Sequence, residues 1–210
     1  MNHKEKGPIN LIITGVGGQG NILISRLLGQ SFIEEGYTVT IGETYGATQR
    51  GGPVASHVRI SREVIPCSPV TPKGKAHIIL GLEPSESLRM LTAFGYSGTA
   101  VVTNLRPIYP LEVAVGEAEY PTTETIRLCV DQLSGRAWFL NASETALALG
   151  NPLLTNIVMT GALIGTGLLP LEKNKIEDQL KLTFKGEKQA VNLRAFDLGY
   201  EAVLLGCSAA

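Results

Sequence analysis

The sequence predicts an α/β protein with a Rossmann-like, mostly parallel sheet, helices on both faces, an antiparallel hairpin insertion and a helical C-terminal third. Three observations support this fold class. Short apolar runs alternate with amphipathic helical patterns from residue 9 to about residue 149, which is the rhythm of βαβ units. A glycine-rich turn separates the first strand from the first helix. After residue 156 the periodicity is helical throughout.

The first strand and helix flank this glycine turn. Residues 9–13 form an apolar run that predicts a buried strand, and apolar residues from Ile24 to Phe32 recur at the helical period. The turn between them matches the G-x-G-x-x-G spacing with one additional glycine, and it consists of Gly15, Gly17, Gly18, Gln19 and Gly20. Such a turn either holds an anion at the helix N-terminus or lets strand and helix pack closely. The spacing alone leaves both roles open.

A polar loop follows the second predicted strand. Residues 38–41 predict a strand parallel to the first, and Glu43 lies where a dinucleotide-binding protein places the acidic residue that holds the ribose. A glycine-rich loop over residues 44–53 then replaces the expected crossover helix. Loops of this length are commonly functional, and a guanidinium group in one could bind a carboxylate or phosphate. We predict a functional loop with the candidate residues Glu43, Tyr45, Gln49, Arg50, Gly51 and Gly52.

The next elements are predicted from alternation and from apolar runs. Residues 54–60 alternate in polarity and, with residues 64–67, suggest a hairpin. Further strands are expected at 76–82, 98–104 and 136–140, and helices from Glu83-Pro84 onward, at 125–132 and at 142–149. Residues 108–121 contain two prolines, Pro110 and Pro121, and predict an irregular loop that could include one edge strand.

The last third of the chain predicts packed helices. Asn156 is expected to cap a helix whose Gly161 and Gly165 offer a small surface for close backbone packing. An amphipathic segment at 171–184 and a final helix at about 187–205 follow. The sequence has no internal repeat and no linker, so we expect a single domain with a core of about residues 9–203.

Two residues are candidates for a ligand crevice, and the chain lacks a complete catalytic set. Glu83 follows a predicted strand and Asn156 opens a helix, although Glu83 is also the acidic residue that a helix N-terminus favours. His57 lies in mid-strand, where a histidine is commonly structural. The sequence contains no G-x-S-x-G and no H-E-x-x-H, and no paired carboxylates stand out as a catalytic pair. We therefore expect no catalytic residue and no metal ligand in this chain.

Charge, hydropathy and cysteine spacing argue against several classes of function. The formal net charge of the 210 residues is −1 and no lysine–arginine cluster occurs, so nucleic-acid binding is not expected. The longest apolar run, 157–169, is too short to span a membrane. Cys67, Cys129 and Cys207 form no C-x-x-C pair, which argues against an iron–sulfur or zinc site in this chain. Sparse cysteines and a polar N-terminus without a signal peptide predict a cytoplasmic location.

Several stretches together resemble a known family. These are Gly15–Gly20, Glu43–Gly52 with its Gln-Arg-Gly-Gly sequence, Ser56–Ile60, Leu82–Pro84, Gly150-Asn151, Asn156–Ala162 and Asn192–Phe196. They resemble the gamma-type domain of the 2-oxoacid:ferredoxin oxidoreductases, and the loop is most similar to the beta subunit of indolepyruvate:ferredoxin oxidoreductase. The similarity extends over about residues 9–203.

The resemblance implies a non-catalytic subunit. A larger partner subunit would hold thiamine diphosphate, Mg²⁺ and [4Fe-4S] clusters, and the complex would decarboxylate indolepyruvate or another 2-oxoacid. The acyl group would pass to coenzyme A and the electrons to ferredoxin. This chain would bind no cofactor alone. Its loop from Glu43 to Gly52 would face the partner subunit, and the chain would help to form the route for coenzyme A. The residues also leave open a free-standing NAD(P)-binding oxidoreductase, with Glu43 on the ribose, and a scaffold subunit without a ligand.

Overall fold

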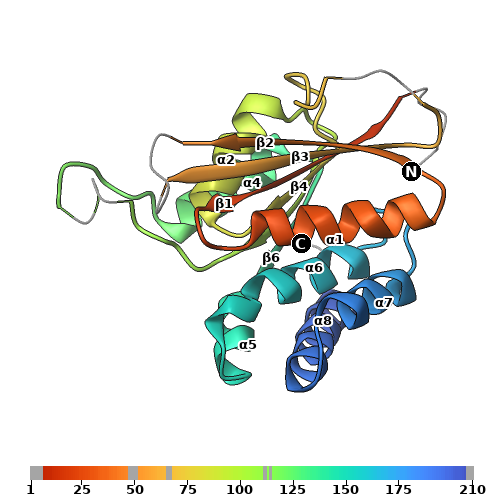
Figure 1. The fold of residues 1–210 in the computed structure, drawn as a ribbon. Helices are drawn as coiled ribbons and strands as arrows, with labels where there is room; N and C mark the ends of the chain where they lie inside the picture. The colour runs from red at the N-terminus through yellow and green to blue at the C-terminus, as the bar shows by residue number, and fades with distance from the viewer. Residues whose placement is uncertain (1–6, 47–51, 65–67, 111–112, 114, 207–210) are drawn as a thin grey trace.

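A six-stranded mixed sheet forms the centre of the protein (Figure 1). The computed structural model describes residues 7–46, 52–64, 68–110, 113 and 115–206. The strands are β1 (Ile9–Val16), β2 (Thr38–Tyr45), β3 (Pro53–Ser61), β4 (Ile78–Gly81), β5 (Ala100–Asn104) and β6 (Arg136–Leu140). Their order in the sheet is β2-β3-β1-β4-β5-β6. The predicted fold class is confirmed.

The hairpin is present, but its partners differ from the prediction. β3 pairs antiparallel with β2 on one side and with β1 on the other, whereas β1, β4, β5 and β6 are mutually parallel. Because both edges of β3 are already hydrogen-bonded, residues 64–67 cannot be its hairpin partner, and that prediction is wrong. Residues 65–67 themselves lie outside the described residues. β2 does run parallel to β1, but β3 separates the two strands.

Helices cover both faces of the sheet (Figure 1). They are α1 (Asn21–Glu34), α2 (Pro84–Phe94), α4 (Thr123–Leu133), α5 (Ala142–Ala148), the 3₁₀ turn η1 (Pro152–Leu154), α6 (Thr155–Gly165), α7 (Lys173–Thr183) and α8 (Glu187–Gly206). Leu11 and Ile13 of β1 point into a large core with α1 and α6, and α7 and α8 pack behind these helices. Ile12 points to the other face, where it joins a smaller core beneath α2 and α4. This is the alternation that a strand buried on both faces requires.

Glycines set the contact between α6 and α8. A Cβ atom on Gly161 would lie 2.0 Å from the Phe196 carbonyl oxygen, and one on Gly165 would lie 2.7 Å from that of Tyr200. Gly199 meets Val158 in the same way from the opposite helix, at 1.8 Å. The predicted close-packing surface is therefore confirmed.

Two local expectations are wrong. The side chain of Asn156 does not cap α6, because the helix begins one residue earlier, after η1. Asn151 instead caps the 3₁₀ turn η1 that precedes α6, and its side chain accepts a hydrogen bond from the Leu153 N–H. Between β5 and α4 the described residues form no strand, so the possible edge strand is absent from that part of the segment. None of the helices in the described part of the chain has the length and apolar character needed to cross a bilayer.

Candidate functional site

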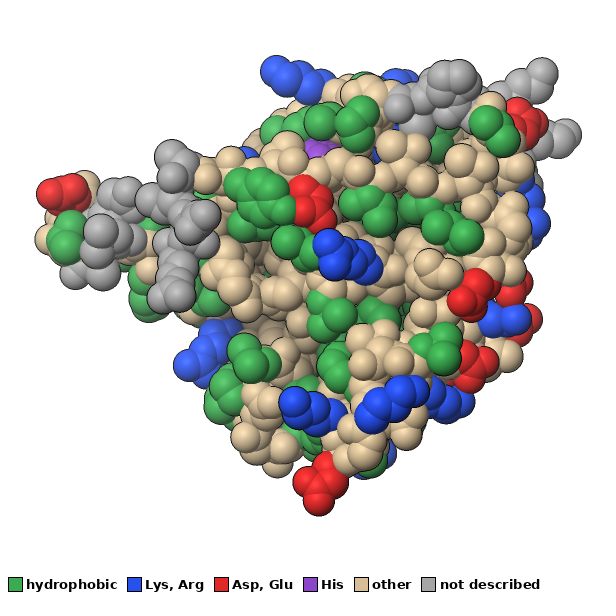
Figure 2. All heavy atoms as spheres, viewed as in Figure 1, with side chains coloured by type: hydrophobic (Ala, Val, Ile, Leu, Met, Phe, Trp, Pro, Cys, Tyr) green, Lys and Arg blue, Asp and Glu red, His purple; other side chains and the backbone are tan. Residues whose placement is uncertain are grey.

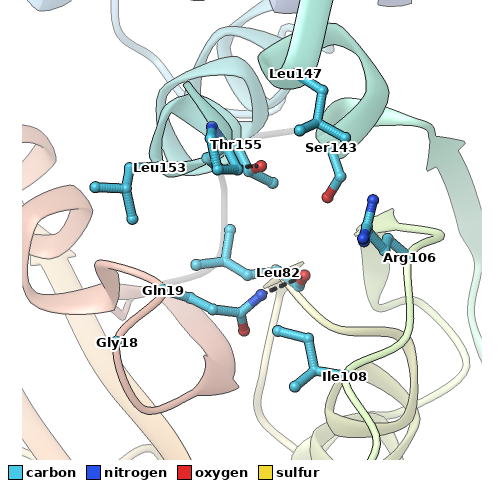
Figure 3. Close-up of a pocket in the computed structure, with 10 residues that line it drawn as sticks. Gly18, Gln19, Leu82, Arg106, Ile108, Ser143, Leu147, Leu153 and Thr155 are labelled. Atoms are coloured by element: carbon cyan, nitrogen blue, oxygen red, sulfur yellow. Dashed lines mark hydrogen bonds between the residues drawn. The ribbon is translucent and has the colours of Figure 1, made fainter. Parts of the chain in front are cut away.

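A cavity of about 310 Å³ opens at the carboxyl edge of the parallel strands (Figure 3). Each wall comes from a segment that follows one of these strands. The lining residues are Gly18, Gln19, Leu82, Arg106, Ile108, Ser143, Leu147, Pro152, Leu153 and Thr155. β1 and β4 are neighbours whose connections leave in opposite directions, and open α/β sheets bind ligands in the crevice at such a switch point.

The glycine turn lies where it was predicted and forms one wall. Gln19 closes it: its Oε1 accepts from the Val16 N–H at 2.7 Å, and its Nε2 donates to the Leu82 carbonyl at 3.0 Å. One amide side chain thus joins the ends of β1 and β4. The Gln19 N–H also donates to the Val16 carbonyl oxygen. These hydrogen bonds support close packing as at least one role of the turn.

Two asparagines press against the same turn from the core. Gly20 has a φ of +89° and a Cβ there would lie 2.1 Å from Asn156 Nδ2, so this position admits only glycine without strain. Asn21 donates from Nδ2 to the Val54 carbonyl oxygen at 3.1 Å. Both asparagines are buried, and their Oδ1 atoms have no hydrogen-bond partner in the described structure. Asn156 therefore supports the turn from behind and does not line the cavity.

The turn is joined to the polar loop by one backbone hydrogen bond. The Gly17 N–H donates to the Gly52 carbonyl oxygen at 2.9 Å, and the Gly46 N–H donates to that of Pro53 at 2.8 Å. The two ends of the loop are thereby held together at Gly46 and Pro53, and Gly52 is fixed beside the glycine turn that lines the cavity. The predicted loop residues Gln49, Arg50 and Gly51 lie outside the described residues.

Glu43 and Tyr45 lie on the edge strand, away from the cavity. The Tyr45 hydroxyl donates to the Glu43 carboxylate, and this hydrogen bond is the main reason that the pKa of Tyr45 is raised. Because β3 intervenes, β2 is two strand spacings, about 10 Å, from β1. A ribose-binding acid belongs on the strand next to the glycine turn. The displaced position of Glu43 therefore gives no support to the NAD(P)-binding alternative.

Glu83 is fully buried and accepts four hydrogen bonds. Its Oε2 accepts from the Glu86 N–H at 2.8 Å and from Ser85 Oγ at 2.7 Å, which caps α2. Its Oε1 accepts from the Ile108 N–H at 3.3 Å and from the Tyr120 hydroxyl. Burial and this last hydrogen bond raise the pKa of Tyr120. The structure thus gives Glu83 the helix-capping role and places it behind the cavity wall.

The polar groups of the cavity include two residues that the sequence prediction missed. Ser143 Oγ accepts from Asn104 Nδ2 at 3.0 Å, which leaves the hydroxyl proton free to donate to a ligand. The Arg106 side chain lies beside Ser143 and has no carboxylate partner in the described part of the chain (Figure 3). Leu82, Ile108, Leu147 and Leu153 supply apolar walls. This combination suits a ligand with both an anionic group and an apolar part.

The two histidines among the described residues have structural roles. Burial lowers the pKa of His57, whose Nδ1 accepts from the Thr71 N–H at 3.4 Å and whose ring packs edge-on against Phe94. His77 Nδ1 accepts from the Asn10 N–H at 2.9 Å. Neither residue lines the cavity. Within the described residues, no group of three or more His, Cys, Asp or Glu side chains could hold a metal ion.

Sheet order, glycine turn and switch-point cavity define a Rossmann-like α/β protein in which an antiparallel strand is inserted beside the glycine turn. Residues 10–202 match the family described as pyruvate ferredoxin/flavodoxin oxidoreductase. The chain belongs to this family, and the resemblance seen in its motifs is confirmed.

Relatives of known name match along almost the whole chain. The chain is 39% identical over 194 residues to the indolepyruvate oxidoreductase subunit IorB of Pyrococcus horikoshii, covering 92% of this chain and 95% of that protein. It is 35% identical over 198 residues to the subunit of the same name from Archaeoglobus fulgidus, covering 94% and 96%.

Solved structures share the fold. The pyruvate oxidoreductase subunit PORC of Thermotoga maritima superposes with a TM-score of 0.68 at 21% identity, covering 93% of this chain and 97% of that one. The 2-oxoglutarate:ferredoxin oxidoreductase of Magnetococcus marinus gives a TM-score of 0.72 at 23% identity. In that comparison 98% of this chain corresponds to 32% of the longer chain.

Proposed function

We propose that this chain is the non-catalytic, gamma-type subunit of a cytoplasmic indolepyruvate:ferredoxin oxidoreductase. The observation that carries the proposal is its 33–39% identity to four archaeal indolepyruvate oxidoreductase subunits, along 92–94% of the chain. The missing catalytic set in the sequence agrees with it, since the chemistry would then belong to a partner.

The partner subunit would supply the reacting groups. Thiamine diphosphate with Mg²⁺ provides decarboxylation chemistry when bound there, and [4Fe-4S] clusters carry the electrons to ferredoxin. The cysteines of this chain lack the spacing of a cluster motif, which is why we place the clusters in the partner. The glycine-rich loop, whose residue Gly52 is hydrogen-bonded to the glycine turn, would face that partner.

The cavity gives this chain a part in binding coenzyme A. Arg106 and the Ser143 hydroxyl would hold an anionic group of the co-substrate, and Leu82 and Ile108 would contact an apolar part. At about 310 Å³ the cavity lies near the lower end of the roughly 300–1,000 Å³ typical of ligand pockets. It would therefore hold one portion of coenzyme A while the partner holds the rest.

Co-expression with the larger thiamine-binding subunit from the same genome tests the proposal. We expect a stable complex that reduces ferredoxin with indolepyruvate and coenzyme A, and an isolated chain without activity. Titration of the isolated chain with NAD⁺ and NADP⁺ in a calorimeter should give no binding heat. Nicotinamide binding by the isolated chain, or an assembled complex inactive on every aryl 2-oxoacid tried, would contradict the proposal.

Replacing Arg50 with alanine is expected to weaken the assembled enzyme. A guanidinium that pairs with an anion at an interface contributes enough for about a tenfold loss in kcat/KM for coenzyme A. Arg62→Ala is the matched control, because Arg62 lies at the opposite end of the β2–β3 hairpin, over the Tyr37 ring. If the Arg50 variant keeps the turnover and coenzyme A affinity of the control, the loop does not act at the active site.

A further inference from the structure

The segment between β5 and α4 supplies Arg106 and Ile108 to the cavity, and its first residues are fixed at two points. The Leu105 N–H donates to the Leu140 carbonyl oxygen at 2.9 Å, and the Ile108 N–H donates to Glu83 Oε1 at 3.3 Å. Arg106 lies between these anchors. The second anchor depends on Glu83, which is buried and held in place by its contacts at the start of α2.

The far end of the same segment returns to the same carboxylate. Tyr120, three residues before α4 begins, donates its hydroxyl to Glu83 Oε1. One buried oxygen therefore joins both ends of the segment that carries the cavity wall. Tyr109, within the segment, packs edge-on against Tyr120 with the ring centroids 5.1 Å apart. Figure 3 shows Arg106 and Ile108 on the wall that this arrangement supports.

We propose that Glu83 and Tyr120 are positioning residues that hold Arg106 and Ile108 against the cavity and so set the affinity for the anionic part of coenzyme A. This inference rests on the proposed function, in which the cavity holds part of coenzyme A. Neither residue lines the cavity, so both act through the segment. Loss of the Tyr120 hydroxyl lets the Arg106 wall shift while leaving Glu83 its other three donors.

Tyr120→Phe in the assembled complex is the first test. We expect the Kd for coenzyme A, measured by calorimetry without 2-oxoacid, to rise about fivefold to tenfold, as expected for loss of one hydrogen bond of typical net strength. The KM for coenzyme A should rise by the same factor, and kcat at saturating coenzyme A should stay within about twofold.

Tyr109→Phe is the matched control, because it also removes one phenolic hydroxyl, from the ring that packs against Tyr120. Tyr109 is largely exposed, and its hydroxyl makes no hydrogen bond in the described part of the chain. We expect this variant to bind coenzyme A like the wild type. Melting temperatures of the two variants should agree within a few degrees, which separates positioning from general loss of stability.

A double-mutant cycle tests whether Tyr120 acts through Arg106. Arg106→Gln should weaken coenzyme A binding on its own, and adding Tyr120→Phe should then cost less than about twofold more. A full additional loss in the double variant would overturn the route through Arg106.

The remaining outcomes separate this inference from the proposed function. If the wild-type complex binds coenzyme A and Tyr120→Phe behaves like Tyr109→Phe, the positioning role is overturned and the proposed function stands. If the wild-type complex turns over and the Arg106→Gln variant binds coenzyme A as tightly as the wild type, the role of this cavity in coenzyme A binding is overturned. A wild-type complex that binds no coenzyme A overturns both.

Discussion

Gly161→Ala is expected to lower the free energy of unfolding by about 3 kcal/mol, at the upper end of what overpacking costs. A glycine-to-alanine change inside a helix ordinarily stabilises by about 0.5–1 kcal/mol, because alanine loses less backbone entropy. At Gly161 the change is expected to destabilise instead, because the new Cβ would lie 2.0 Å from the Phe196 carbonyl oxygen. That atom belongs to the backbone of α8, so a rotamer change cannot relieve the contact and the two helices must separate.

Thermal unfolding followed by circular dichroism checks this expectation. For a chain of this size, 3 kcal/mol corresponds to a fall in Tm of about 6–12 °C. Gly29→Ala is the control: Gly29 lies inside α1, but its Cβ would meet only the ends of side chains, Ile41 Cδ1 at 3.0 Å and Val39 Cγ1 at 3.7 Å. A side-chain terminus can move aside, so this variant should change Tm by no more than a few degrees. Equal effects from both variants would show that the α6–α8 contact tolerates a methyl group.

Gly20→Ala is the second change with a large expected effect, again about 3 kcal/mol. An L-residue at a φ of +89° carries a left-handed strain of roughly 1–2 kcal/mol. The added Cβ also meets Asn156 Nδ2 at 2.1 Å, and Asn156 is buried, so its displacement opens the packing behind the turn. The glycine turn should therefore lose its shape together with its stability.

Gly18→Ala separates the two contributions. Gly18 has a φ of +98°, but a Cβ there meets nothing within 4 Å, so this variant carries the backbone strain alone. We expect it to lose roughly 1–2 kcal/mol in urea unfolding, with Gly20→Ala losing more. Adding Asn156→Ala to Gly20→Ala should relieve the steric part only. If Gly18→Ala proves the more damaging variant, the contact with Asn156 does not matter.

The sequence predicted the elements better than their pairing. Strand and helix positions follow from local periodicity, so α1, α2 and α8 were expected close to where they lie. The place of β3 between β1 and β2 was not predicted, because period-2 alternation identifies a strand but not its neighbours. Residue type alone predicts Asn156 as a helix cap, whereas the structure gives a capping role to Asn151, which precedes the proline that starts η1.

Only the part of the site that carries a local sequence motif was predicted. The glycine turn carries a sequence signature, and it does line the cavity through Gly18 and Gln19. Arg106 and Ser143 carry no motif, and only their location after β5 and β6 could have indicated them. Glu83 accepts hydrogen bonds from Ser85 and Glu86 at the start of α2, and from Ile108 and Tyr120. Sequence spacing could not reveal the last two partners, because they lie across an irregular segment.

The hydrogen bond from the Gly17 N–H to the Gly52 carbonyl oxygen has a thermodynamic consequence. It joins the glycine turn, whose Gly18 lines the cavity, to Gly52 at the end of the loop between β2 and β3. Coupling between two binding events is reciprocal in free energy. In the proposed complex, a ligand in the cavity would strengthen binding of the β2–β3 loop to the partner subunit by the same factor as the partner subunit strengthens ligand binding. The proposed non-catalytic subunit would in this way influence turnover through linkage alone.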